Sequence, residues 1–101
     1  MIEYREYKDR RIYRRAKLMA TARDMCSADS LDNLQAEYDQ LCIRIDGIKD
    51  SIKYFNTTIT PLQLDLFEQQ LSAMVAYKNV IELRASIENV KLKDYKADLG
   101  A

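Results

Sequence analysis

The most constraining feature of the sequence is a run of apolar residues in its middle that repeats with heptad spacing. Successive members are separated alternately by three and four residues, and they are Leu31, Leu34, Tyr38, Leu41, Ile45, Ile48, Ile52 and Phe55. A period of about 3.5 residues, sustained along a segment of this length, keeps one narrow stripe of a helix facing a partner helix. The run therefore predicts a helix over about residues 31–55 that packs in the manner of a coiled coil.

The composition favours helices in the rest of the chain as well. The 101 residues include only two glycines and one proline, so residues that favour the turns between strands are scarce. A chain of this length suits one domain, and we predict a single all-α domain over residues 1–101. A basic N-terminal helix is expected over about residues 2–25, followed by an antiparallel helical hairpin over about residues 31–94.

Two short motifs mark where the hairpin helices begin. Asp29 or Ser30 is suited to cap the first of them, because their side chains accept hydrogen bonds from free backbone amides. Thr60, Pro61 and Gln63 have the spacing of a capping box with proline in the first helical position. These residues predict a sharp start for the last helix.

The last helix, expected over about residues 61–94, carries two apolar stripes. One consists of Leu64, Phe67, Leu71, Met74 and Ile81, and the other consists of Ala73, Ala76, Val80, Leu83, Ile87 and Val90. At about 100° per residue the two stripes point roughly 140° apart, so one antiparallel neighbour cannot cover both. We therefore expect a homo-oligomer, with an interface that includes Ala73, Tyr77, Val80 and Ile87.

The neutral chain has an uneven distribution of charge. Residues 1–23 contain eight Lys and Arg side chains against three acidic ones, a net charge of +5, and the remainder carries −5. The basic segment either binds an anion or docks on the acidic remainder through salt bridges. For the first alternative, an aromatic ring and arginine forks suit a base and its phosphates, and the candidate ligand-binding residues are Tyr7, Arg10, Arg11, Arg14 and Arg15.

Catalytic and metal-binding signatures are absent from the sequence. It contains no histidine and no glycine-rich phosphate loop, so we expect no enzymatic activity, no metal site and no cofactor. Cys26 and Cys42 are expected to be buried thiols in a reducing compartment. The first residues do not form an apolar leader, and no apolar run is long enough to span a membrane. We therefore expect a soluble cytoplasmic protein without a membrane partner.

The hairpin resembles a family of small helical-hairpin proteins encoded by tailed phages, including crAss-like phages. The resemblance covers about residues 34–90 and is carried by Glu37-Tyr38-x-x-Leu41-x-x-Arg44-Ile45-x-x-Ile48, Thr60-Pro61 and Gln70-Leu71-x-x-Met74-x-x-Tyr77-x-x-Val80-Ile81-x-Leu83-Arg84-x-x-Ile87. The basic first segment is outside this pattern. In architecture the chain is also similar to the anti-CBASS cyclic-nucleotide sponges of phages, which are short helical chains that hold immune signalling nucleotides between subunits.

The resemblance implies a phage accessory protein that counters host defence in the cytoplasm of the host cell. Its expected action is to sequester a host immune signalling nucleotide, of the cyclic or ADP-ribose type, between subunits. The alternatives are an inhibitor that binds a host defence protein, as an anti-CRISPR does, and a helical protein that binds DNA or RNA through the N-terminal arginines. A nucleic-acid complex would weaken steeply with salt, because counterions are released on binding.

Overall fold

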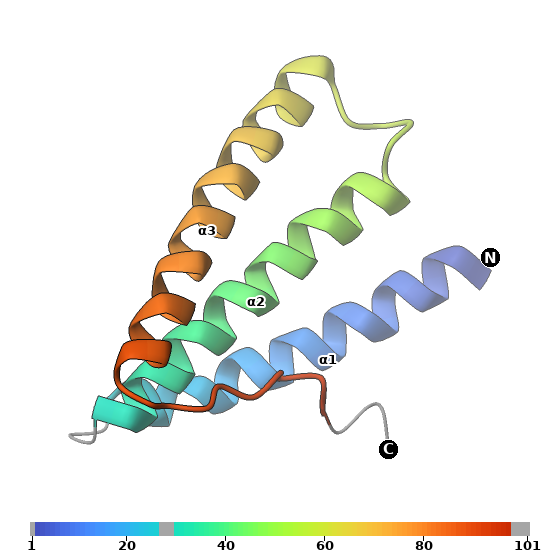
Figure 1. Cartoon of the computed structure of the whole chain (residues 1–101). Coiled ribbons are helices and arrows are strands. Elements are labelled where there is room, and N and C mark those ends of the chain that lie inside the picture. The colour runs from blue at the N-terminus through green and yellow to red at the C-terminus, as the bar shows by residue number, and fades with distance from the viewer. Residues whose placement is uncertain (1, 27–29, 98–101) are drawn as a thin grey trace.

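The computed structural model describes residues 2–26 and 30–97, and this part of the chain forms three α-helices and no strand. The helices are α1 (Ile2–Met25), α2 (Ser30–Tyr54) and α3 (Pro61–Ile87). Helix α1 precedes an antiparallel hairpin of α2 and α3, as Figure 1 shows. The all-α prediction is therefore confirmed. None of the described helices is long and apolar enough to cross a membrane.

Helix α2 lies between the other two helices (Figure 1). Helices α1 and α3 each pack against α2, and within the described ranges no Cα atom of α1 comes within 8 Å of one in α3. The molecule is consequently elongated, with extents of 43 × 29 × 24 Å. Among the helices of residues 2–26 and 30–97, α2 is thus the one that covers α3.

Three members of the heptad stripe of α2, namely Leu34, Tyr38 and Leu41, pack against α3, as the sequence predicts, whereas its last member, Phe55, contacts Tyr7 of α1. Leu34 of α2 joins Ile81 and Ala85 of α3 in a buried cluster, and Tyr38 and Leu41 pack against it. Ile81 is fully buried, with no exposed surface. The first of the two apolar stripes predicted for α3 therefore faces α2, and burial of these side chains is the main apolar contribution to the stability of the hairpin.

A second face of α2 is also buried, which the heptad pattern does not predict. Ala36, Ile43 and Asp50 are spaced by seven residues, and each retains at most 5% of its exposed surface. This face lies against α1 through polar contacts, including a hydrogen bond of 3.0 Å that the Gln40 amide donates to the Thr21 hydroxyl. The contact with α1 is thus more polar than the contact with α3.

Helix α3 begins as predicted. The Gln63 backbone amide donates to the Thr60 hydroxyl at 3.2 Å, and the Thr60 amide donates to the Gln63 side chain at 2.9 Å. Pro61 occupies the first helical turn. The capping box is therefore confirmed. The cap predicted for α2, at Asp29 or Ser30, lies outside the residues whose side chains the structure describes.

The end of α3 differs from the prediction. The helix ends at Ile87 instead of continuing to about residue 94. Asn89 adopts a left-handed conformation with a φ of 57°, and the Val90 and Asn89 amides donate to the Ala85 and Ser86 carbonyls at 2.8 and 3.3 Å. This pattern is a Schellman motif, in which asparagine takes the place usually held by glycine. Val90 consequently leaves the second apolar stripe and packs against the buried cluster.

The cysteines agree with the sequence only in part. Cys42 is half-buried, but Cys26 is exposed, so the prediction of two buried thiols is wrong for Cys26. Cys26 lies directly after the last residue of α1, outside the helix. No group of three or more potential metal ligands occurs in the two described segments.

Candidate functional site

Residues 88–97, here called the strap, fold back across α2 after the end of α3 (Figure 1). The Gln35 side chain of α2 donates to the Lys93 carbonyl at 3.0 Å and accepts from the Lys93 amide at 3.0 Å. One glutamine thus satisfies both backbone groups of Lys93, in the way that a neighbouring strand would. This pair of hydrogen bonds positions the residues that follow.

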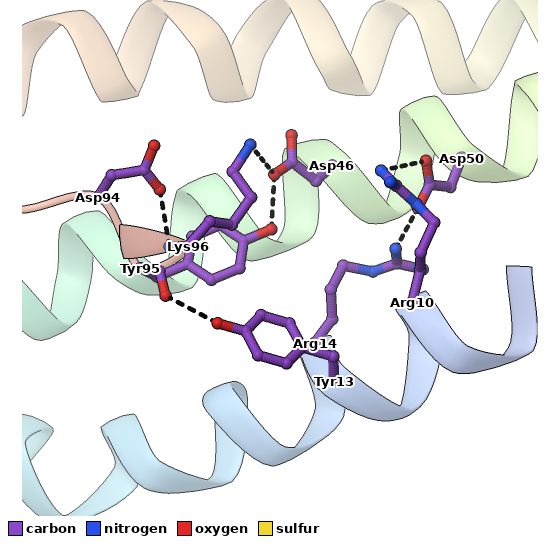
Figure 2. A network of polar contacts seen from close by, with 8 residues as sticks. All are labelled: Arg10, Tyr13, Arg14, Asp46, Asp50, Asp94, Tyr95 and Lys96. Carbon is purple, nitrogen blue, oxygen red and sulfur yellow. Dashed lines mark hydrogen bonds and ion pairs between the residues drawn. The ribbon is translucent and has the colours of Figure 1, made fainter. Parts of the chain in front are cut away.

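Tyr95 anchors the strap between α1 and α2, as Figure 2 shows. Only 8% of its surface is exposed, and its hydroxyl donates to the Asp46 carboxylate at 2.5 Å. Its carbonyl accepts a hydrogen bond of 3.2 Å from the Tyr13 hydroxyl of α1. The adjacent Lys96 places its ammonium 3.4 Å from the same Asp46 oxygen. The strap is therefore joined to α1 through the Tyr95 carbonyl and to α2 through the side chains of Tyr95 and Lys96.

Two arginines of α1 share a single carboxylate of α2 (Figure 2). Arg10 donates to both oxygens of Asp50, at 2.9 and 3.1 Å, and the buried Arg14 donates to one of them. The Arg14 side chain passes close to Gly47 of α2, where a Cβ atom would be in ordinary van der Waals contact with Nε at 3.5 Å. Two positive charges against one negative charge leave a net positive charge. The half-exposed Arg10 still has a terminal nitrogen available for another acceptor.

These contacts border a pocket of about 190 Å³ between α1 and the strap. Its walls are formed by two phenol rings, three cationic side chains and one carboxylate, namely Tyr13, Tyr95, Arg10, Arg14, Lys96 and Asp9. The rings of Tyr13 and Tyr95 are inclined by 30°, with centroids 6.4 Å apart. Aromatic faces beside guanidinium and ammonium groups can bind a planar base and an anionic group together. This pocket is our candidate functional site.

The structure does not gather the five predicted ligand-binding residues into one site. Arg10 and Arg14 meet at Asp50 and border the pocket. Tyr7 instead packs its ring against Tyr54 and Phe55, with centroids 5.6 and 4.8 Å apart. Arg11 and Arg15 lie on the exposed side of α1. For Arg10 and Arg14, the salt bridges to Asp50 are those expected if α1 docks on the acidic remainder of the chain.

Sequence reasoning missed four of the six residues that line the pocket, namely Asp9, Tyr13, Tyr95 and Lys96. The sequence offered one usable signal, because Asn89 precedes these strap residues and asparagine is the commonest substitute for glycine at a left-handed helix end. A helix end at Asn89 would place Tyr95 and Lys96 in a segment after α3, and such a segment can fold back onto α1. Nothing in the local sequence indicates that Tyr13 would meet them.

Of the predicted interface residues, Ala73, Val80 and Ile87 lie on the side of α3 away from α2, whereas Tyr77 reaches α2. Ala73 is exposed, and Tyr77, Val80 and Ile87 are 48%, 54% and 83% exposed. The Tyr77 hydroxyl donates to the Glu37 carboxylate of α2. The second apolar stripe therefore stays exposed along α3 within the single chain.

Burial raises the pKa values of two tyrosines, Tyr38 and Tyr95. Burial, followed by the hydrogen bond to Asp46 and its negative charge, raises the pKa of Tyr95 well above its ordinary value. Burial, followed by the nearby Cys42, raises the pKa of Tyr38 to about 12. In both cases the folded state disfavours the phenolate, which the unfolded chain forms above its ordinary pKa of about 10.

Stability is therefore expected to fall as the pH rises above about 10, because the unfolded chain releases phenolic protons that the folded chain retains. The Tyr38 contribution should continue to fall until the pH reaches its folded pKa of about 12. Thermal unfolding followed by circular dichroism at pH 8 and pH 11 measures the loss. The loss should be smaller in Tyr95→Phe, and Tyr7→Phe controls for removal of one phenol. An equal loss in the wild type and Tyr95→Phe would contradict the argument.

The comparisons with known proteins identify one family. Residues 28–87, more than half of the chain, match the model of a family described as Sequestin. No curated protein and no solved structure was found to match the chain. The matched segment includes the whole of α2 and α3. All six residues that line the pocket lie outside it, in α1 and the strap.

Proposed function

Because the chain belongs to the Sequestin family, we propose that it acts by binding a ligand and withholding it from solution. The family name points to sequestration, which requires binding and no chemical step. The observation that carries the proposal is the pocket between α1 and the strap, where two phenol rings lie beside Arg10, Arg14 and Lys96.

The pocket chemistry favours a nucleotide as the ligand. A base can stack on the half-buried Tyr13, and a phosphate can accept from Arg10 and Lys96, whose side chains are 49% and 46% exposed. The pocket volume of about 190 Å³ is smaller than the roughly 300 to 1,000 Å³ of typical ligand sites. It would therefore enclose one part of the nucleotide, and the remainder would extend over the surface or reach a second subunit.

The biological role that we propose is counter-defence by a phage accessory protein in the host cytoplasm. The ligand would then be a host immune signalling nucleotide, of the cyclic or ADP-ribose type, held between subunits. Support for this role comes from the resemblance of the hairpin to phage helical-hairpin proteins and from the Sequestin family match. Because the pocket residues lie outside the matched segment, α1 and the strap would determine which ligand is bound.

Calorimetric titration with a panel of signalling nucleotides tests this function. The wild type should bind at least one of them and release it unchanged on denaturation. Arg10→Ala or Lys96→Ala should weaken binding about ten- to a hundredfold, because a charge-assisted hydrogen bond of roughly 1.5 to 3 kcal/mol is lost. Arg15→Ala is the matched control, since this arginine is exposed on α1 and does not line the pocket.

Absence of binding by every nucleotide at high micromolar concentration would overturn the nucleotide proposal. The second candidate function would then be inhibition of a host defence protein. The exposed side chains Val80, Leu83 and Ile87 favour that alternative, because an apolar helix face can dock on a protein groove. The two functions predict different effects of Lys96→Ala, which should leave a protein-binding activity of α3 unchanged.

A further inference from the structure

A second heptad stripe runs along the side of α3 that faces away from α2. We call it the outer stripe, and its members alternate in steps of four and three residues: Leu62, Leu66, Gln69, Ala73, Ala76, Val80, Leu83 and Ile87. Its five large apolar members are between 54% and 83% exposed. A continuous stripe of this spacing is typical of a helix that packs against another helix.

The positions beside the outer stripe are also typical of an interface. They are mostly uncharged, and they are Gln63, Asp65, Gln70, Ser72, Tyr77, Asn79, Arg84 and Ser86. Interfaces are depleted of charged residues at their centre relative to the rest of a protein surface. Helix α1, whose exposed surface carries many charges, shows no such depletion. The outer stripe and its flanks therefore indicate a surface that is covered by another helix.

We propose that the outer stripe docks on the same stripe of a second copy of this chain, with the two α3 helices antiparallel. A twofold axis between Ala73 and Ala76 would pair the large residues at one end of the stripe with the large residues at the other end. Leu62 then meets Ile87 of the second copy, and Leu66 meets Leu83 of the second copy. The small residues Ala73 and Ala76 meet at the axis, where they let the two backbones approach closely.

The charges on α3 select the antiparallel direction. Its first half carries Asp65 and Glu68 and no basic residue, whereas its second half carries Lys78 and Arg84 against Glu82. The twofold axis places Asp65 level with Arg84 of the second copy. A parallel pair would place the two acidic halves side by side. The helix dipoles likewise favour the antiparallel pair.

This interface is independent of the proposed ligand. The outer stripe lies on α3, whereas the pocket lies between α1 and the strap, and α1 does not approach α3. This pairing therefore does not form the pocket, and a nucleotide held between subunits would require a separate contact made by α1 or the strap. The whole stripe also lies within residues 28–87, the segment that matches the family.

Sedimentation velocity of the wild-type chain and of Leu83→Asp tests the interface. The wild type should sediment as a dimer or a larger assembly at tens of micromolar. Leu83→Asp should raise the dissociation constant at least about a hundredfold, because two apolar contacts are lost symmetrically and a charge is placed opposite Leu66 of the second copy. Leu83 is 65% exposed, so the helical circular dichroism of the variant should be unchanged.

Ile12→Asp is the matched control, since Ile12 of α1 is 59% exposed and lies away from α3. It should leave the assembly unchanged. A wild-type monomer at tens of micromolar would overturn the proposal, and so would an equal loss of association in the two variants.

Crosslinking with a short bis-maleimide determines the direction of the helices, in a background of Cys26→Ser and Cys42→Ser. A mixture of Leu62→Cys and Ile87→Cys chains should give a crosslinked heterodimer, whereas each variant alone should not. In an antiparallel pair the two copies of residue 62 lie about 38 Å apart, at 1.5 Å per helical residue. Efficient crosslinking of either variant with itself would indicate a parallel pair and overturn the proposal.

Discussion

Replacing Asp50 with alanine is expected to lower the free energy of unfolding by about 3 to 5 kcal/mol, a large part of the stability of a domain of this size. The reason is the position of Arg14, which is 8% exposed and donates to Asp50 from the neighbouring helix. Without the carboxylate, a buried guanidinium would have no counterion. Urea unfolding of the wild type and of Asp50→Ala, followed by circular dichroism, measures the difference.

Two further variants test whether the buried charge is the cause. Arg10→Ala should cost no more than about 1 kcal/mol, because half of that side chain is exposed and its salt bridge is screened by water. The double variant Arg14→Met with Asp50→Leu should recover most of the stability lost in Asp50→Ala, since apolar replacement of both partners leaves no buried charge. A loss below 1 kcal/mol in Asp50→Ala would show that Arg14 finds solvent or another partner.

Replacing Ile81 with alanine is expected to cost about 2 to 5 kcal/mol, because a fully buried side chain leaves a cavity when it is truncated. Ile81 belongs to the buried cluster between α2 and α3, beside Leu34 and Ala85. Thermal or urea unfolding measures the loss. A loss of unfolding free energy below about 1 kcal/mol would contradict this prediction, because it would mean that the neighbouring side chains fill the cavity.

Val80→Ala is the matched control for Ile81→Ala, because Val80 is the adjacent residue of the same helix and is 54% exposed. Its truncation should change the stability of a monomer by less than about 0.5 kcal/mol. Val80 also belongs to the outer stripe of α3. The unfolding of Ile81→Ala and of Val80→Ala should therefore be measured in chains that also carry Leu83→Asp. There the proposed pairing of two chains does not contribute to the measured stability.

Local sequence signals predicted the extent of α1 and α2 and the start of α3. The heptad spacing from Leu31 to Phe55 indicates both the length of α2 and its packing against α3. The capping box at Thr60 marks the start of α3, because its hydrogen bonds involve residues only three positions apart. Such features can be deduced from sequence alone, since the residues that form them are neighbours along the chain.

The pocket could not be predicted in the same way. Tyr13 and Tyr95 are 82 positions apart, and their contact depends on where the strap turns at Asn89. The sequence also did not predict the burial of Asp50, because an aspartate in a helical pattern is normally assigned to the solvent-exposed side. Its burial depends on Arg14, a partner 36 positions away. Long-range polar contacts of this kind leave no periodic pattern in the sequence.

The placement of α2 between two helices that do not meet bears on how this chain can change during evolution. Substitutions in the pocket-lining face of α1 alter a surface that α3 never contacts. Their energetic effects should therefore add to those of substitutions in α3, as they do for residues without shared partners. The hairpin can thus remain a constant scaffold while substitutions accumulate in the first helix.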